Sequence, residues 1–208
     1  MSAGIDKLEG SRRLIETAIE LFFENKDSLS VHSLAYSAFK VLFDLYPHRS
    51  NDDFSKRLDQ AIGREGWKSM SGIANFLKHA DKDPDELMRP HHPMQGMIIL
   101  VFAVILYRRI SGELTLKMMA FDYWTDELAY DAIGIEELDE NIERVAKFKE
   151  IRTAIQDLPF DAQIVIGKRM YEDFIKIHES AVRMIEEGKS KGLNLTQILD
   201  ENLKKHED

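Results

Sequence analysis

The chain has 208 residues, of which 44% are hydrophobic and 31% are charged, and its formal net charge is −9. These values are typical of one globular domain, or of one domain with a helical extension. The absence of cysteine excludes disulfides, cysteine-ligated zinc and thiol nucleophiles, and the negative charge argues against a broad basic face for duplex DNA or anionic lipid. Residues 1–25 mix acidic and basic side chains without an apolar core, so we expect no signal peptide and a cytoplasmic protein.

The first part of the chain has apolar residues at every third or fourth position, a spacing that predicts helices. We expect these helices over residues 11–25, 31–45, 54–62 and 65–80. The second of them follows the cap candidates Asp27, Ser28 and Ser30, and Pro47 ends it.

The middle of the chain carries the longest apolar run, at residues 97–107. As a helix this run would be about 16 Å long, roughly half the hydrocarbon thickness of a bilayer. We therefore interpret it as a buried core helix over residues 94–110, stopped by Gly112, and we expect no association with a membrane. A further helix is expected over residues 116–128.

The composition changes near residue 130, because residues 131–208 hold 18 acidic and 12 basic side chains. We expect helices over residues 138–155, 162–187 and 195–205, with a break at the GKSKG sequence of residues 188–192.

The pattern as a whole predicts an all-α fold, with an N-terminal helical bundle in residues 1–130 and an acidic helical extension in residues 131–208. Amphipathic helices must bury their apolar stripe, either on their own bundle or on a partner. We therefore expect a homo-oligomer, most simply a homodimer, or a protein partner bound through the C-terminal helices.

Reactive side chains are densest in the stretch from Asn75 to His92. Asn75 and His79 are four residues apart on a predicted helix and share a face, which makes them the candidate catalytic pair. The candidate ligands of a divalent metal are His79, Asp81, His91 and His92. The simpler interpretation is a helix end with a cationic histidine, followed by a solvated acidic loop.

His32 lies beside the apolar stripe of the second predicted helix. We expect its ring to bond a neighbouring carbonyl or hydroxyl group. The alternative is contact with His79 across the bundle, which would bring His32 into the same site. Trp67 and Trp124 occur at helical spacing with no cofactor motif near them, and we expect both in the core.

Residues 73–86, with the sequence IANFLKHADKDPDE, and the helical pattern of residues 15–44 resemble a family of uncharacterised bacterial all-helical proteins. The same segment resembles the HEPN superfamily of helical bundles, many of which are dimeric RNases. The HEPN motif is an Arg, often followed by Asn, with a His four to six residues after the Arg. Asn75 and His79 match the Asn and the His, whereas Ala74 stands at the Arg position. The resemblance implies that His79 would act as acid–base or bind a scissile phosphate, without the Arg that stabilises phosphorane charge.

Three hypotheses of function follow. The first is a non-enzymatic interaction or regulatory module, to which the missing Arg and the amphipathic C-terminal helices point. The second is an RNA-directed or metal-dependent phosphodiesterase with its site around His79, although the net charge does not support nucleic acid as a partner. The third is a metal-binding or small-ligand-binding bundle.

Overall fold

The computed structural model describes residues 4–79, 81, 84–88, 90–128 and 153–204. Every regular element in these ranges is a helix, which confirms the predicted all-α fold. In chain order the elements are α1 (Lys7–Phe23), α2 (Ser28–Leu45), the 3₁₀ helix η1 (Tyr46–His48), α3 (Phe54–Lys78), α4 (Pro93–Ser111), α5 (Leu116–Leu128), α8 (Phe160–Ser190) and α9 (Leu195–Lys204).

The helix ends follow local sequence signals. Asp27 is the N-cap of α2, and its carboxylate accepts a hydrogen bond from the Ser30 backbone N–H. Gly112 ends α4 in the left-handed conformation, with φ of 81°. The predicted helix boundaries therefore agree with the structure to within a few residues at these positions.

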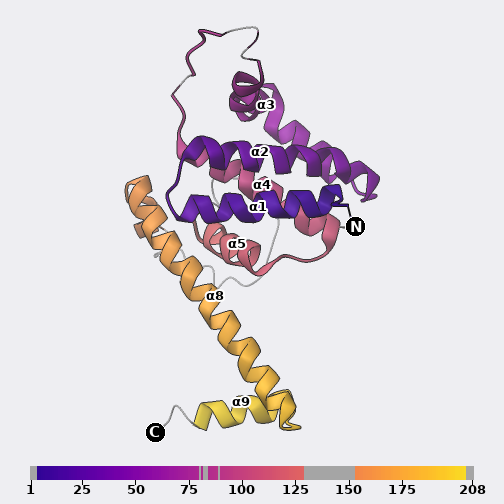
Figure 1. Ribbon diagram of the computed structural model, residues 1–208, viewed down its shortest axis with the longest axis vertical. Helices are drawn as coiled ribbons and strands as arrows, with labels where there is room; N and C mark the ends of the chain where they lie inside the picture. The colour runs from indigo at the N-terminus through magenta and orange to yellow at the C-terminus, as the bar shows by residue number, and fades with distance from the viewer. Residues whose placement is uncertain (1–3, 80, 82–83, 89, 129–152, 205–208) are drawn as a thin grey trace.

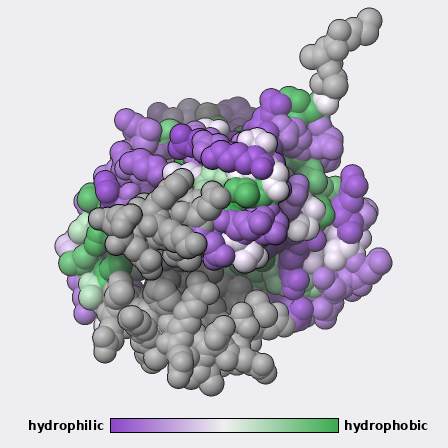
Figure 2. All heavy atoms as spheres, turned by 90° about the horizontal axis from the view of Figure 1, so that it is seen from below, coloured by the Kyte–Doolittle hydropathy of each residue, from purple (hydrophilic) through white to green (hydrophobic). Residues whose placement is uncertain are grey.

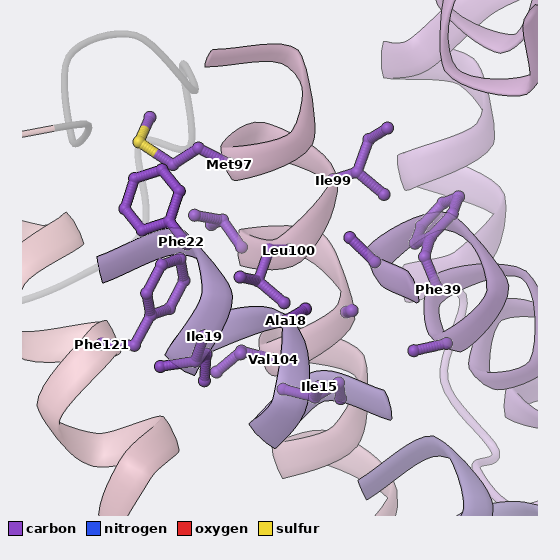
Figure 3. Packing of buried hydrophobic residues seen from close by; sticks show 14 of the residues in the cluster. Ile15, Ala18, Ile19, Phe22, Phe39, Met97, Ile99, Leu100, Val104 and Phe121 are labelled. Atoms are coloured by element: carbon purple, nitrogen blue, oxygen red, sulfur yellow. The ribbon is translucent and has the colours of Figure 1, made fainter. Parts of the chain in front are cut away.

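The core of the bundle lies where α4 packs against α1 and α2. Figure 3 shows Ile15 and Ile19 of α1 beside Leu100 and Val104 of α4, and all four are fully or almost fully buried. This confirms the 97–107 run as part of a core helix. Among the described residues, α4 is the one helix with the length and hydropathy to cross a membrane, and half of its most apolar window is buried inside the protein.

The two helices predicted over residues 54–62 and 65–80 are present as the two segments of α3. The break between them survives as a kink at Gly63, whose φ of 59° and ψ of 179° are not helical. Only glycine adopts that backbone geometry at little cost. The C-terminal part of α3 packs on α2, where Trp67 meets Phe39 and Phe43.

The longest helix among the described residues, α8, leaves the bundle about halfway along its length (Figure 1). Its N-terminal half packs on α5 and α1, where Gly167 lies against Trp124 and Phe23. Trp124 is fully buried, as expected. The C-terminal half extends into solvent, and α9 folds back at its tip.

The predicted helix break at residues 188–192 is confirmed at its C-terminal end, where the chain turns at Gly192 with φ of 77°. The break begins slightly later than predicted, because α8 continues to Ser190 and Gly188 is a buried helical residue on which Ile198 of α9 packs. Gly188 therefore serves a close helix–helix contact. The predicted helix over residues 138–155 lies almost wholly outside the described residues, as does the predicted boundary near residue 130.

Candidate functional site

A pocket of about 490 Å³ lies between α3 and the segment that leads into α4. Its polar and charged lining side chains are Glu65, Lys68, Ser69, Ser71, Asn75, Glu86, His91 and Gln95. The pocket is therefore lined by part of the stretch from Asn75 to His92, where reactive side chains are densest, and also by Gln95 from the first turn of α4.

The two predicted catalytic residues have different surroundings. Asn75 lines the pocket, and its amide group donates a long hydrogen bond of 3.4 Å to the Ser71 hydroxyl. His79 is exposed, caps the C-terminus of α3, and is not among the residues that line the pocket. Ala74, at the HEPN Arg position, is buried, so this position faces the protein interior rather than the pocket.

The four predicted metal ligands do not meet. His79 and Asp81 are both exposed. The exposed His92 is the N-cap of α4, where its Nδ1 accepts a hydrogen bond from the Met94 backbone N–H. Among the described residues, no three His, Asp or Glu side chains lie close enough to hold one metal ion. The predicted four-residue metal site is therefore not formed as a single site.

His91, the remaining candidate, turns toward the interior and meets His32. The two ring centroids are 5.1 Å apart and the ring planes are at 80°. The alternative that His32 contacts His79 is thus replaced by contact with His91. His32 and His91 come from separate segments of the sequence. They form a pair beneath the pocket, where α2 crosses the start of α4.

The environment of His32 agrees with the prediction that its ring bonds a carbonyl group. It is fully buried, and its Nε2 donates to the backbone carbonyl of Met70 on α3, at 2.8 Å. Burial disfavours the imidazolium form and lowers the pKa of His32 below its ordinary value, although the bond to Met70 acts in the opposite direction. His32 is therefore a neutral donor inside the bundle at neutral pH.

Sequence reasoning missed Gln95, whose Oε1 accepts from His91 Nδ1 at 2.9 Å. The spacing of His91 and Gln95, four residues apart at the start of a helix, was the available signal. The pairing of His91 with His32 left no comparable signal, because it depends on how α2 and α4 cross.

A second feature of possible function is the arm, defined here as residues 174–204: the C-terminal half of α8 together with α9. Apolar side chains on it are open to solvent, with exposed fractions of 70% for Ile177, 56% for Leu195 and 47% for Leu199. Viewed from the α9 end, the described surface is mainly hydrophilic and carries smaller hydrophobic areas (Figure 2). A contiguous exposed apolar surface is a feature of protein–protein interaction sites.

No protein-family model matches this chain, and neither a curated protein nor a solved structure is significantly similar to it.

Proposed function

We propose that this protein is a non-enzymatic helical interaction module that pairs with a second copy of itself through the arm. The observation that carries the proposal is the continuation of an apolar stripe along α8 after this helix has left the bundle. Phe174, which packs against Tyr123 of α5, begins the stripe, and Ile177, Ala181 and Met184 continue it at helical spacing.

Ile177 is the largely exposed member of this stripe, whereas Phe174, Ala181 and Met184 are half-buried. Ile177 is 70% exposed although it lies in line with side chains that the bundle covers nearer the start of α8. Fully burying a side chain of this size contributes about 1.5–3 kcal/mol relative to leaving it in water. A partner that covers the arm would recover a large part of this energy.

The short helix α9 supports the same conclusion. It has ten residues, and isolated helices shorter than about 12–15 residues are marginal in water. Its Ile198 is buried against Gly188, but Leu195 and Leu199 on neighbouring positions of α9 remain exposed. A partner that packs on Leu195 and Leu199 would hold α9 in place.

The charge of the arm favours a second copy of the chain as this partner. Residues 174–204 contain five acidic and five basic side chains, whereas the chain as a whole has a net charge of −9. Two acidic bundles repel each other, but two arms of zero net charge can approach without this penalty. A two-fold symmetric pair through the same surface is the commonest form of oligomer.

The catalytic alternative has weaker geometric support. His79 lies at an exposed helix end outside the pocket, and the position of the HEPN Arg is a buried alanine. A general acid–base site needs its groups within hydrogen-bond reach of one reacting atom. Asn75 and His79 share a helix face but not a pocket.

Sedimentation analysis of three chains tests the proposal. We expect the wild type to be a dimer, Ile177→Glu to shift the equilibrium at least about tenfold toward monomer, and Val165→Glu to behave as the wild type. Val165 is the matched control because it lies on the same helix, is 69% exposed, and is on the half of α8 that packs on the bundle. A wild type that stays monomeric to about 100 μM contradicts self-association. A dimer that Ile177→Glu leaves unchanged excludes the arm as the interface.

Cross-linking locates the contact independently of affinity. The chain contains no cysteine, so a single introduced thiol reports one position without background. Mild oxidation should convert Ala181→Cys to a covalent dimer, because Ala181 lies one turn after Ile177 on the same stripe. Val165→Cys should remain mostly monomeric, and equal dimer yields from the two variants count against the arm.

A further inference from the structure

The pair of His32 and His91 leaves two buried nitrogen atoms without partners. His32 Nδ1 and His91 Nε2 are both inaccessible to solvent, and neither makes a hydrogen bond within the described part of the chain. A buried polar atom without a hydrogen bond costs about 1–3 kcal/mol. Two such atoms on adjacent rings call for a common explanation.

The hydrogen bonds on the other side of each ring define what these two nitrogens are. His32 Nε2 faces the Met70 carbonyl, which only accepts, so Nε2 carries the proton and Nδ1 of the neutral ring carries a lone pair. His91 Nδ1 faces Gln95 Oε1 in the same way, which leaves the lone pair on Nε2. Two electron-pair donors therefore lie on neighbouring rings.

Histidines that ligate a metal ion have hydrogen bonds of this kind on the far side of the ring. A ligating histidine almost always donates its second ring N–H to a carbonyl or carboxylate oxygen, and both rings do so here. With metal–nitrogen bonds of about 2.0–2.1 Å and a tetrahedral angle, two bound imidazole rings have centres about 5 Å apart. The centroids of His32 and His91 are 5.1 Å apart.

We propose that His32 and His91 are two protein ligands of a site for a borderline transition-metal cation, of which Zn²⁺ is the representative. His32 binds through Nδ1 and His91 through Nε2, while Met70 and Gln95 orient the two rings. Neutral imidazole suits Zn²⁺, Cu²⁺ and Ni²⁺, whereas Mg²⁺ and Ca²⁺ prefer oxygen ligands.

The pair adjoins the pocket described above. His91 and Gln95 line this pocket of about 490 Å³, whereas the two unpartnered nitrogen atoms are themselves inaccessible to solvent in the structure. Two protein ligands leave coordination positions open, which is a feature of metal sites that exchange ligands rather than of closed structural sites.

The packing around the pair suits a preformed site. Gly96 at the start of α4 lies against the His32 backbone, and a Cβ at Gly96 would be 3.4 Å from His32 Cα. That distance is ordinary van der Waals contact, so α4 and α2 lie close together beside His32. His32 has no freedom to move away, because it is fully buried and bonded to α3.

Titration of the untagged chain with Zn²⁺, and with Co²⁺ as a spectroscopic probe, tests this proposal. We expect one ion per chain, and a Co²⁺ absorption spectrum characteristic of nitrogen and oxygen ligands. His91→Gln should weaken Zn²⁺ affinity at least about tenfold, and it carries the test because His91 is only half-buried. His92→Gln and His79→Gln are the matched controls and should bind as the wild type, because both side chains are exposed and outside the pair.

Substitutions of Gln95 test whether this residue orients His91, because one of them should strengthen Zn²⁺ binding. Gln95→Glu places a carboxylate on His91 Nδ1 and should tighten Zn²⁺ binding several-fold, whereas Gln95→Ala should weaken it. Absence of Zn²⁺ and Co²⁺ binding by the wild type, or equal binding by His91→Gln, overturns the site. Ile177→Glu should still bind Zn²⁺. The outcome of the metal titration is therefore independent of the outcome of the self-association test.

Discussion

The bundle and the arm are built from helices of similar amphipathic sequence, but they differ in what covers the apolar stripe. In the bundle, α4 is surrounded by α1, α2 and α5, and side chains such as Leu100 and Leu106 are completely buried. In the arm, α8 has α9 beside it at its tip, and Ile177 remains 70% exposed. The difference teaches that a helical sequence pattern specifies a face to be covered, while the tertiary structure decides whether this chain or another covers it.

Truncation of one apolar side chain in each region gives the largest contrast. Leu100→Ala should lower the free energy of unfolding by about 2–5 kcal/mol, because it removes a buried side chain and leaves a cavity. Ile177→Ala should change the stability of the monomer by no more than about 0.5 kcal/mol, because its side chain is largely in water already. Urea unfolding followed by circular dichroism, at a concentration where the chain is monomeric, measures both. Similar losses for the two variants would show that the bundle of the same chain covers the arm.

Two glycine substitutions in α8 test the same difference between bundle and arm, and their effects on stability should be of intermediate size. A Cβ at Gly167 would overlap the Trp124 ring, so Gly167→Ala should cost about 1–3 kcal/mol and weaken the docking of α8 on the bundle. A Cβ at Gly188 would overlap Ile198, so Gly188→Ala should release α9 and leave the bundle intact.

Hydrogen exchange distinguishes these two outcomes. Gly188→Ala should raise exchange in α9 alone, whereas Gly167→Ala should raise it along the first half of α8 and in α5. Increased exchange throughout the protein in Gly188→Ala would mean that the arm and the bundle unfold as one unit.

The smallest effects concern one carboxylate beneath the bundle surface and one on the outer side of α8. Burial raises the pKa of Asp122 above its ordinary value, although Arg108 partly opposes this through a 3.0 Å ion pair. Because the folded form then binds a proton more tightly than the unfolded form, this group stabilises the fold at low pH. That contribution is lost as pH rises from the unfolded pKa through the raised folded pKa.

Asp122→Asn should therefore remove this decline, and at neutral pH it should be neutral or stabilising by up to about 1 kcal/mol. The control is Asp173→Asn on α8, whose ion pair with Arg169 is exposed and should contribute no more than a few tenths of a kcal/mol. Thermal unfolding as a function of pH measures both variants. A loss of more than about 1 kcal/mol in Asp122→Asn at neutral pH would mean that the Arg108 pair outweighs the cost of burial.

Local sequence signals predicted the helices because the interactions that start and end them are local. Asp27 caps α2 through a residue three positions away, and Gly112 ends α4 through its own backbone geometry. The helical period likewise identified the core side chains of α1, α2 and α4, because each helix must bury one continuous face. The sequence also predicted an interruption at Gly63, because two separate amphipathic segments flank it.

The candidate sites depended on contacts that no local pattern encodes. The sequence grouped His79, Asp81, His91 and His92 because they are neighbours in the chain, but the structure turns His91 inward to His32 and leaves His79 at an exposed helix end. In the same way, the glycine at position 188 suggested a helix break, but Gly188 is helical and Ile198 packs against it. The amino-acid sequence by itself determined which segments are helical and which face of each avoids water, since both are set within a few turns. Only the tertiary structure decided which of these faces and polar groups meet, because that depends on the angles at which helices far apart in the chain cross.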